Sequence, residues 1–110
     1  MKIETIPAAG AVVLKVSGRL DAGNVPVFDE ACEDCLRGGL THVVVDLSQV
    51  DYIGSAGVHS FLTVGKALQM NNGSLILSGV HGVVKEVFDM TRLTTLFPVF
   101  DTPDSALRSI

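Results

Sequence analysis

A serine with very small neighbours stands where the chain changes from a strand-like to a helix-like pattern. In "DYIGSAGVHSFL", residues 51–62, Ser55 follows Gly54 and precedes Ala56 and Gly57. From Ser55 onward the apolar residues recur at spacings of three and four, which is typical of a helix with one buried face. A hydroxyl at the start of a helix can cap backbone N–H groups, or it can accept a phosphoryl group from another protein.

Capping explains Ser55 taken alone, but it does not explain the residues around it. Ser is a favoured N-cap residue. A cap needs no small neighbours, however, and Gly57 inside the first turn costs roughly 1 kcal/mol relative to Ala. Small side chains leave the hydroxyl and the backbone open to close approach, and the positive end of a helix tolerates the charge of a phosphoserine. The same charge would oppose a partner docked there, so the pattern is typical of a switch.

The residues around Ser55 do not complete a catalytic or cofactor-binding motif. A nucleophile elbow needs G-x-S-x-G, and Ile53 stands where the first Gly would be. The stretch "GVHSFLTVGKA" has the wrong spacing for a phosphate-binding loop, and the chain has no G-x-G-x-x-G. We therefore predict no catalytic residue, no enzyme activity and no cofactor. A serine nucleophile with partners elsewhere in the chain remains the minor alternative.

Cys32 and Cys35 form a C-x-x-C pair late in a helical pattern. A redox pair normally stands at a helix N-terminus, where the dipole stabilises the thiolate. Four acidic residues flank this pair and disfavour a further anion: Asp29, Glu30, Glu33 and Asp34. The three histidines do not supply two more ligands at the spacing of a zinc site. We predict two buried cysteines that behave as small apolar side chains, and no metal site.

The composition predicts one globular domain over residues 1–110. The chain is 47% hydrophobic and 18% charged, with a net charge of −4. Its eight Lys and Arg residues are scattered, so no basic stripe indicates direct binding of nucleic acid. No apolar run approaches the ~18 residues of a membrane span, and the N-terminus lacks the apolar core of a signal peptide. We expect no membrane insertion and a cytoplasmic location.

Alternating or short β-branched runs predict five strands, at residues 2–6, 11–17, 42–47, 74–79 and 96–100. The first two form a pair that turns at "PAAG". Pro98 confines the last strand to an edge or an end of the sheet. Asp46 and Asp51 are interpreted as turn and strand-end residues.

Helical spacing predicts four helices between and after these strands. The first begins after Asn24 as its N-cap and stops at Gly38-Gly39, and the last begins after Thr102 as its N-cap. The helix from Ser55 should bury the arc Val58, Phe61, Leu62, Gly65 and Leu68. The helix over residues 80–90 should bury Val80, Val83, Val84, Val87 and Phe88.

The alternation of strands and helices predicts an α/β fold. We expect a mixed, mainly parallel sheet of about five strands with about four helices. Functional groups gather in the loops at the carboxyl ends of such strands, and Ser55 stands in a loop of that kind.

The run "VVVDLSQVDYIGSAGVHSFL" resembles the signature of bacterial anti-sigma factor antagonists, the soluble single-domain members of the STAS superfamily. In that family a buried strand and a DLS-type turn lead into D-S-[ST]-G-[LV] at a helix start. "VSGRLDAGNV" is similar to the family's GELD stretch, and "VKEVFDMTRLTTLFPVFDTPDSAL" is similar to its C-terminal third. The resemblance spans nearly the whole chain in the right order and implies a STAS-like fold.

The resemblance implies a partner-switching protein. Such a protein, when unphosphorylated, binds an anti-sigma factor that is also a serine kinase of the histidine-kinase-like ATPase type, and this frees a sigma factor for transcription. The kinase phosphorylates the serine of the loop and so releases the antagonist, and a serine phosphatase resets it. By position Ser55 matches the phosphorylated serine, Asp21 matches a family acid near that loop, and Gly57 and Val58 match the motif's Gly-[LV].

We expect the partner to bind around Ser55, on a surface made by Asp21, Asn24, Gly54, Ser55, Ala56, Gly57, Val58 and His59. The chain departs from the family at Gly54, where Asp is common, and this removes a charge beside the acceptor. Some STAS domains act without phosphorylation, as parts of signalling scaffolds or as small subunits of lipid-transport ABC systems. In that alternative Ser55 is only a helix cap and the partner is permanent.

Overall fold

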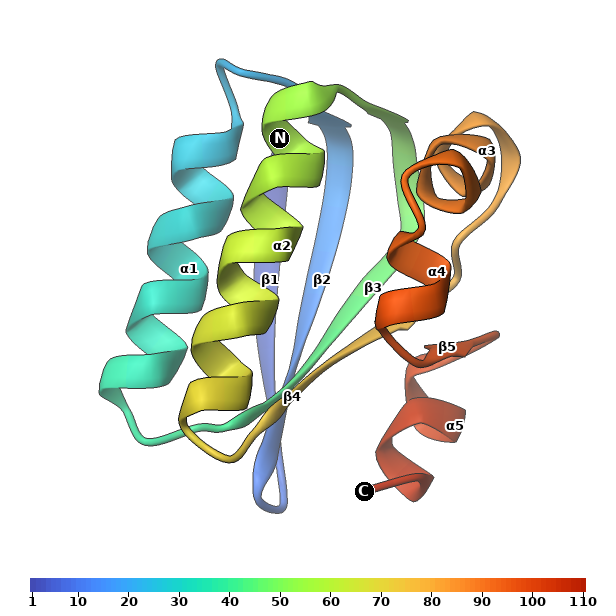
Figure 1. Ribbon diagram of the computed structural model, residues 1–110. Coiled ribbons are helices and arrows are strands. Elements are labelled where there is room, and N and C mark those ends of the chain that lie inside the picture. Colours follow the sequence, from blue (N-terminus) through green and yellow to red (C-terminus); the bar gives the residue numbers. More distant parts are fainter.

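A β-hairpin begins the chain and forms one side of a five-stranded sheet (Figure 1). The computed structural model describes residues 1–110. Strand β1 (Lys2–Ala8) pairs antiparallel with β2 (Ala11–Leu20) across a two-residue turn, in which Gly10 supplies the positive φ of 72°. The parallel strands β3 (His42–Ile53), β4 (Ser74–Ser78) and β5 (Val99–Phe100) follow, so the sheet order is β1-β2-β3-β4-β5.

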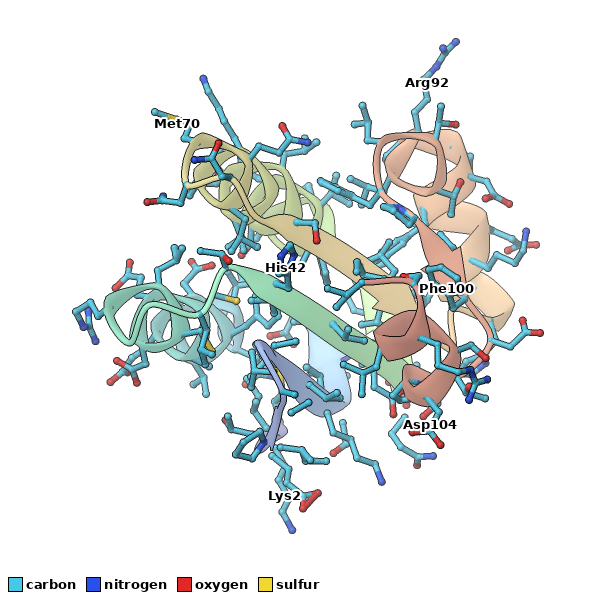
Figure 2. The ribbon with its side chains drawn as sticks, turned by 90° about the horizontal axis from the view of Figure 1, so that it is seen from below. Lys2, His42, Met70, Arg92, Phe100 and Asp104 are labelled. Atoms are coloured by element: carbon cyan, nitrogen blue, oxygen red, sulfur yellow. The ribbon has the colours of Figure 1, made fainter.

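Five helices cover the two faces of this sheet. Their bounds are Val25–Arg37 for α1, Ser55–Met70 for α2, Gly82–Met90 for α3, Leu93–Leu96 for α4 and Pro103–Arg108 for α5. Figure 2 shows α1 and α2 side by side on one side of the sheet and α5 on the other. No helix combines the length and the apolar character that crossing a membrane requires.

The main core lies between the sheet and the helices α1 to α4. It is a cluster of 21 buried residues that includes three phenylalanines from three different helices. The rings of Phe28 and Phe61 lie 5.0 Å apart, and those of Phe61 and Phe88 lie 5.3 Å apart. Aromatic contacts at these distances add to the stabilisation from apolar burial, so this row of rings links α1, α2 and α3 over the sheet. The predicted α/β fold is confirmed.

Strand β3 extends six residues beyond the predicted 42–47, and the interpretation of Asp46 as a turn residue is wrong. The register with β2 shifts between Lys15 and Ser17, so β3 carries an extra residue there instead of turning. The Asp46 carboxylate accepts a hydrogen bond of 3.0 Å from the backbone N–H of Ser48 inside this bulge. The polar stretch after Leu47, which is typical of a turn, is therefore an irregular part of β3. The Asp46 side chain there provides a hydrogen bond to the backbone in place of a regular bond between strands.

A second register shift makes Asp51 an interior residue of β3 and not its end. Gly18 pairs with Val50 and Arg19 pairs with Tyr52, which leaves Asp51 without a partner on β2. Each bulge bends the strand that carries it and changes where its end points. The two bulges therefore determine where β3 ends and where α2 begins.

Two other expectations about the helices are wrong in part. Leu62 and Val83 are 40% and 59% exposed, although both are expected from their spacing to face the core. Val64 is buried on α2 instead, because α2 packs against α1 as well as against the sheet. Helix α4 is not among the predicted helices, and the predicted strand 96–100 shrinks to β5 at the sheet edge.

The contact between α2 and the segment after α4 yields a test of the packing. A Cβ atom built on Gly65 would collide with the ring of Phe97, which is itself buried. We expect Gly65→Ala to lower the free energy of unfolding by about 1–3 kcal/mol, as overpacking does, although Ala is the better helix former. Urea denaturation measures this change.

Gly38→Ala is the matched control for Gly65→Ala. Gly38 ends α1 with φ of −78°, and a Cβ atom added there would have the Asp34 carbonyl oxygen as its nearest neighbour, at an ordinary 3.4 Å. This control should leave stability within about 0.5 kcal/mol of the parent. Adding Phe97→Leu to Gly65→Ala should recover part of the loss, and a Gly65→Ala variant as stable as the control would contradict the packing.

Candidate functional site

Ser55 is the first residue of α2, and Gly54 occupies the N-cap position before it. Gly54 leaves β3 in an extended conformation, with φ −102° and ψ −177°, and its carbonyl oxygen accepts the 3.1 Å bond from the N–H of Val58 that opens the helix. No side chain caps this end. The interpretation of Ser55 as an N-cap is therefore wrong by one position, and the exposed hydroxyl is left without that structural role.

Gly57 is small because of what lies beneath it. A Cβ atom on Gly57 would stand 2.7 Å from Cγ1 of Ile53 and 3.0 Å from the carbonyl oxygen of Leu20. Real Cβ atoms do not approach their neighbours so closely, so any larger residue would push the first turn of α2 away from the sheet. Gly57 is buried and seats the helix, and it does not belong to the exposed surface on which it is expected from the sequence.

The turn between β2 and α1 lies beside the start of α2. The N–H of Gly54 donates a 3.1 Å hydrogen bond to the carbonyl oxygen of Leu20, the last residue of β2. In the next residue, Asp21, the carboxylate accepts a 3.0 Å bond from the N–H of Asn24. Asn24 occupies the predicted N-cap position of α1, but its side chain makes no cap bond and instead donates to the carbonyl oxygen of Arg19 at 2.9 Å.

The fold thus brings together most of the residues that are predicted as a surface. Both turns lie at the end of the sheet from which α1 and α2 start (Figure 1). Asp21 and Asn24 come from one turn, and Gly54, Ser55 and Ala56 come from the other. Val58 instead packs partly against the core, and His59 lies one turn further along α2.

Sequence reasoning missed Arg19 and Tyr52, which lie beside the same loop. The Arg19 guanidinium carbon lies 4.1 Å from the centre of the Tyr52 ring, an arrangement that favours a cation over an aromatic face. Arg19 also approaches the Asp21 carboxylate at 3.7 Å. The Tyr52 hydroxyl oxygen would lie 3.2 Å from a Cβ atom on Gly54. No local signal in the sequence joins Arg19 to Tyr52, because their pairing across β2 and β3 follows a register shift.

The electrostatics around Ser55 favour an anion at the hydroxyl. The backbone dipoles of a helix give its first turn a partial positive charge, and α2 has no acidic residue in that turn. In the adjoining turn, the Asp21 carboxylate is paired with Arg19. An added phosphate would therefore meet the helix start without a carboxylate on its own element to oppose it.

Cys32 and Cys35 are buried and free, as predicted, and they lie in α1 away from its N-terminus. Burial raises the pKa of the Cys32 thiol well above its usual range, and the charges of Cys35, Asp29 and Glu33 raise it further. Burial also raises the pKa of Cys35, with Asp34 adding to the effect. Both thiols are therefore protonated and poorly nucleophilic at neutral pH. No three His, Cys, Asp or Glu side chains converge to hold a metal ion.

Comparison with known proteins gives consistent matches over nearly the whole chain. The STAS domain family matches residues 2–106. The anti-sigma-B factor antagonist of Staphylococcus epidermidis is 34% identical over 99 residues, which cover 90% of this chain and 92% of that protein. An anti-sigma factor antagonist from Mycobacterium paratuberculosis has a crystal structure with a TM-score of 0.89 at 24% identity, over 99% of this chain and 92% of that one.

A further solved structure matches in its fold. The Bacillus cell fate determinant SpoIIAA in its phosphorylated form has a TM-score of 0.78 at 19% identity, with 98% of each chain covered. At 24% and 19% identity, the likeness to these two solved structures shows a shared fold and nothing more. The family match and the Staphylococcus relative carry the sequence relationship.

The raised thiol pKa values yield a prediction about reactivity and pH. We expect iodoacetamide to alkylate Cys32 and Cys35 very slowly in the native protein at pH 8, because the reactive thiolate is scarce and buried. The unfolded thiols ionise near pH 8.5, about their ordinary pKa, while the native ones keep their protons. The free energy of unfolding should therefore fall as the pH rises above about 8.5.

Two measurements check this prediction. Mass spectrometry after alkylation should show both cysteines modified at once in guanidinium chloride and unmodified in buffer. The variant Cys32→Ala/Cys35→Ala should lose less stability between pH 8 and pH 10 than the parent does. Rapid native alkylation at either cysteine would mean that the thiol is accessible and ionised, in conflict with its environment.

Proposed function

The chain belongs to the STAS domain family and is an anti-sigma factor antagonist, and on this basis we propose that phosphorylation of Ser55 switches its binding of an anti-sigma factor. The observation that carries the proposal is the exposed Ser55 at the start of α2, with no capping role and with Gly54 and Ala56 beside it. The role is regulatory, and the protein acts by occupying its partner.

In the unphosphorylated state, the anti-sigma factor docks over the two neighbouring turns, from Asp21 to Asn24 and from Gly54 to Ala56. The uncapped N–H groups at the start of α2 are donors that a partner's acceptors can satisfy on docking. Small side chains at this place let the partner's backbone come close. Docking removes the anti-sigma factor from its sigma factor, which becomes free for transcription.

Phosphorylation replaces a neutral hydroxyl with a group that carries about −1.5 to −2 charges at neutral pH. The helix N-terminus stabilises this charge in the free protein, so the fold is kept. A partner that covers the same place must strip water from the phosphate, and truncating or mismatching a buried charged contact costs about 2–5 kcal/mol of binding. The phosphorylated protein therefore dissociates.

The partner that fits this cycle is an anti-sigma factor that is also a serine kinase of the histidine-kinase-like ATPase type. A bond forms between Ser55 Oγ and the γ-phosphorus of ATP while the bond to the β-phosphate oxygen breaks. ADP leaves, and the hydroxyl proton passes to a base of the kinase. A serine phosphatase restores the hydroxyl by hydrolysis, with water as the co-reactant.

Gly54 supports the switch even though the family pattern has an acid there. A side chain at residue 54 would lie next to the Tyr52 hydroxyl, and the first turn of α2 contains no carboxylate. With Gly54 neutral, a phosphate on Ser55 brings about −1.5 to −2 charges to a helix start that otherwise has no acidic side chain.

Substitution of Ser55 tests the switch at the level of binding. Ser55→Asp should weaken the complex with the cognate anti-sigma factor by at least about tenfold, and Ser55→Ala should leave the affinity close to that of the parent. Isothermal titration calorimetry measures both. Thr95→Asp, which adds the same charge on the exposed side of helix α4, is the control and should bind like the parent.

Equal affinity of Ser55→Asp and Ser55→Ala would contradict the switch. It would favour the alternative in which a STAS domain holds a permanent partner in a scaffold or a transporter. Recovery of a kinase and a sigma regulator by pull-down from the native host separates the two functions.

The modification itself yields a second prediction. Incubation with the cognate kinase and ATP should add one phosphate, and mass spectrometry of peptides should place it on Ser55. Ser55→Ala should remain unmodified and should stay bound to the kinase. Phosphate on another residue, or none on Ser55 in a complex that forms, would refute Ser55 as the acceptor.

A further inference from the structure

A groove of about 380 Å³ runs between α1 and α2 on the outer side of the helix layer. Figure 2 shows these two helices next to one another, with the rest of the helix layer beyond them. The α1 wall is one helical stripe, with Cys32 and Glu33 adjacent and the other steps of three or four residues: Val25, Asp29, Cys32, Glu33 and Leu36. At a rise of 1.5 Å per residue, the stripe from Val25 to Leu36 is about 16 Å long. The groove therefore extends for three turns.

The groove is open because the α2 wall is made of short side chains. It consists of Ala56, His59, Ser60, Thr63, Val64 and Ala67. Ser60 is only 3% exposed, and its hydroxyl donates to the Asp29 carboxylate across the floor. This bond joins the two helices at depth, while Ala56, Thr63 and Ala67 leave the space above it unfilled. The shape is thus fixed by one buried polar contact between small residues.

The charge of the groove is negative. Asp29 and Glu33 line it, and no Lys or Arg is among its lining residues. Arg37 is the basic residue of α1, and it lies 3.9 Å from Glu33 at the far end while also pairing with Asp34. An occupant with positive charges and an apolar side would match both the acids and the apolar walls.

The groove begins at the end of α2 where Ser55 stands. Ala56, directly after Ser55, lines it, and so does Val25 in the first turn of α1. A protein that covers Ser55 and the adjoining turns has the mouth of the groove within its footprint. A standard interface buries about 800 Å² on each partner, which is more than two turns of backbone supply, so contacts must continue beyond them.

We propose that the α1–α2 groove binds a basic amphipathic segment of the anti-sigma factor. The inference rests on the proposed function, and it assigns to this chain a second docking surface that does not contain the phosphorylated residue. The groove binds the partner through acids and apolar contacts along α1 and α2. The phosphorylation state of Ser55 determines whether the partner can also dock over the turns at the start of α2. The groove contribution is then the same for both states of Ser55.

Charge reversal on the α1 wall tests the proposal. Glu33→Lys should weaken binding of the anti-sigma factor about tenfold at low salt, with a smaller effect at high salt because the attraction is screened. Glu30→Lys makes the same change on the same helix, but Glu30 is exposed outside the groove. This control should bind within about twofold of the parent, since a remote surface charge contributes little.

Filling the groove tests its shape independently of charge. Ala67→Phe places a ring in the groove and should weaken binding about tenfold, whereas Gln69→Phe, at an exposed neutral position of α2 outside the groove, should not. Circular dichroism and thermal unfolding establish that each variant folds. In the kinase reaction, both groove variants should raise KM for the antagonist and leave kcat unchanged, because Ser55 and its surroundings are intact.

The combination with Ser55→Asp separates this proposal from the proposed function. Glu33→Lys should weaken binding by the same factor with Ser or with Asp at position 55, as expected of separate sites. Sensitivity to Ser55→Asp without sensitivity to Glu33→Lys or Ala67→Phe would overturn the groove and keep the switch. Insensitivity to all three overturns both. Groove variants that alter self-association in sedimentation, and not partner binding, would make the groove an interface between copies of this chain and overturn the proposal.

Discussion

The contact of the first turn of α2 with the end of β2 determines where Ser55 lies. One backbone atom, the carbonyl oxygen of Leu20, does two things in this contact. It accepts the N–H of Gly54 at 3.1 Å, and it lies 3.0 Å from the place that a Cβ atom on Gly57 would take. The hydrogen bond draws the chain toward the sheet, and only glycine permits the helix to follow so closely. Ser55, between these two glycines and on the opposite side, is exposed as a result.

The strands and helices could be predicted from the sequence because their apolar residues recur periodically. The bulges in β3 and the exact start of α2 could not be predicted in this way. The strand runs, the Gly38-Gly39 stop and the Thr102 cap are local signals. The structure has the stop, the cap and a strand at each run, although β3 is longer and β5 shorter than predicted. The bulges in β3 arise from its register with β2, which no local pattern encodes. For the same reason local reasoning makes Asp46 a turn residue. The N-cap of α2 is Gly54 and not Ser55 because the bond to Leu20 fixes the helix start from outside.

The parts of the candidate site that are contiguous in the sequence could be predicted. Gly54 to Ala56 are contiguous in the sequence, and the turn from Asp21 to Asn24 is recognisable by its likeness to a family stretch. Arg19 stacks on Tyr52 only because two strands lie side by side, and the α1–α2 groove exists only because two helices do. The acids of α1 alone are typical of a solvated helix face. They line a groove because α2 presents alanine, serine and threonine opposite them.

The distance between the two parts of the proposed interface explains why recognition and switching need not interfere. Glu33 lies eight residues beyond Val25 in α1, or about 12 Å at 1.5 Å per residue, and the far end of the groove at Leu36 lies about 16 Å from Val25. At physiological ionic strength exposed charges are screened over about 8 Å, so a phosphate at the near end of the groove changes the potential at Glu33 only weakly. A partner held along the groove therefore meets the same acids before and after phosphorylation. Only the turns at the helix start differ, where the phosphate is added beside the uncharged Gly54.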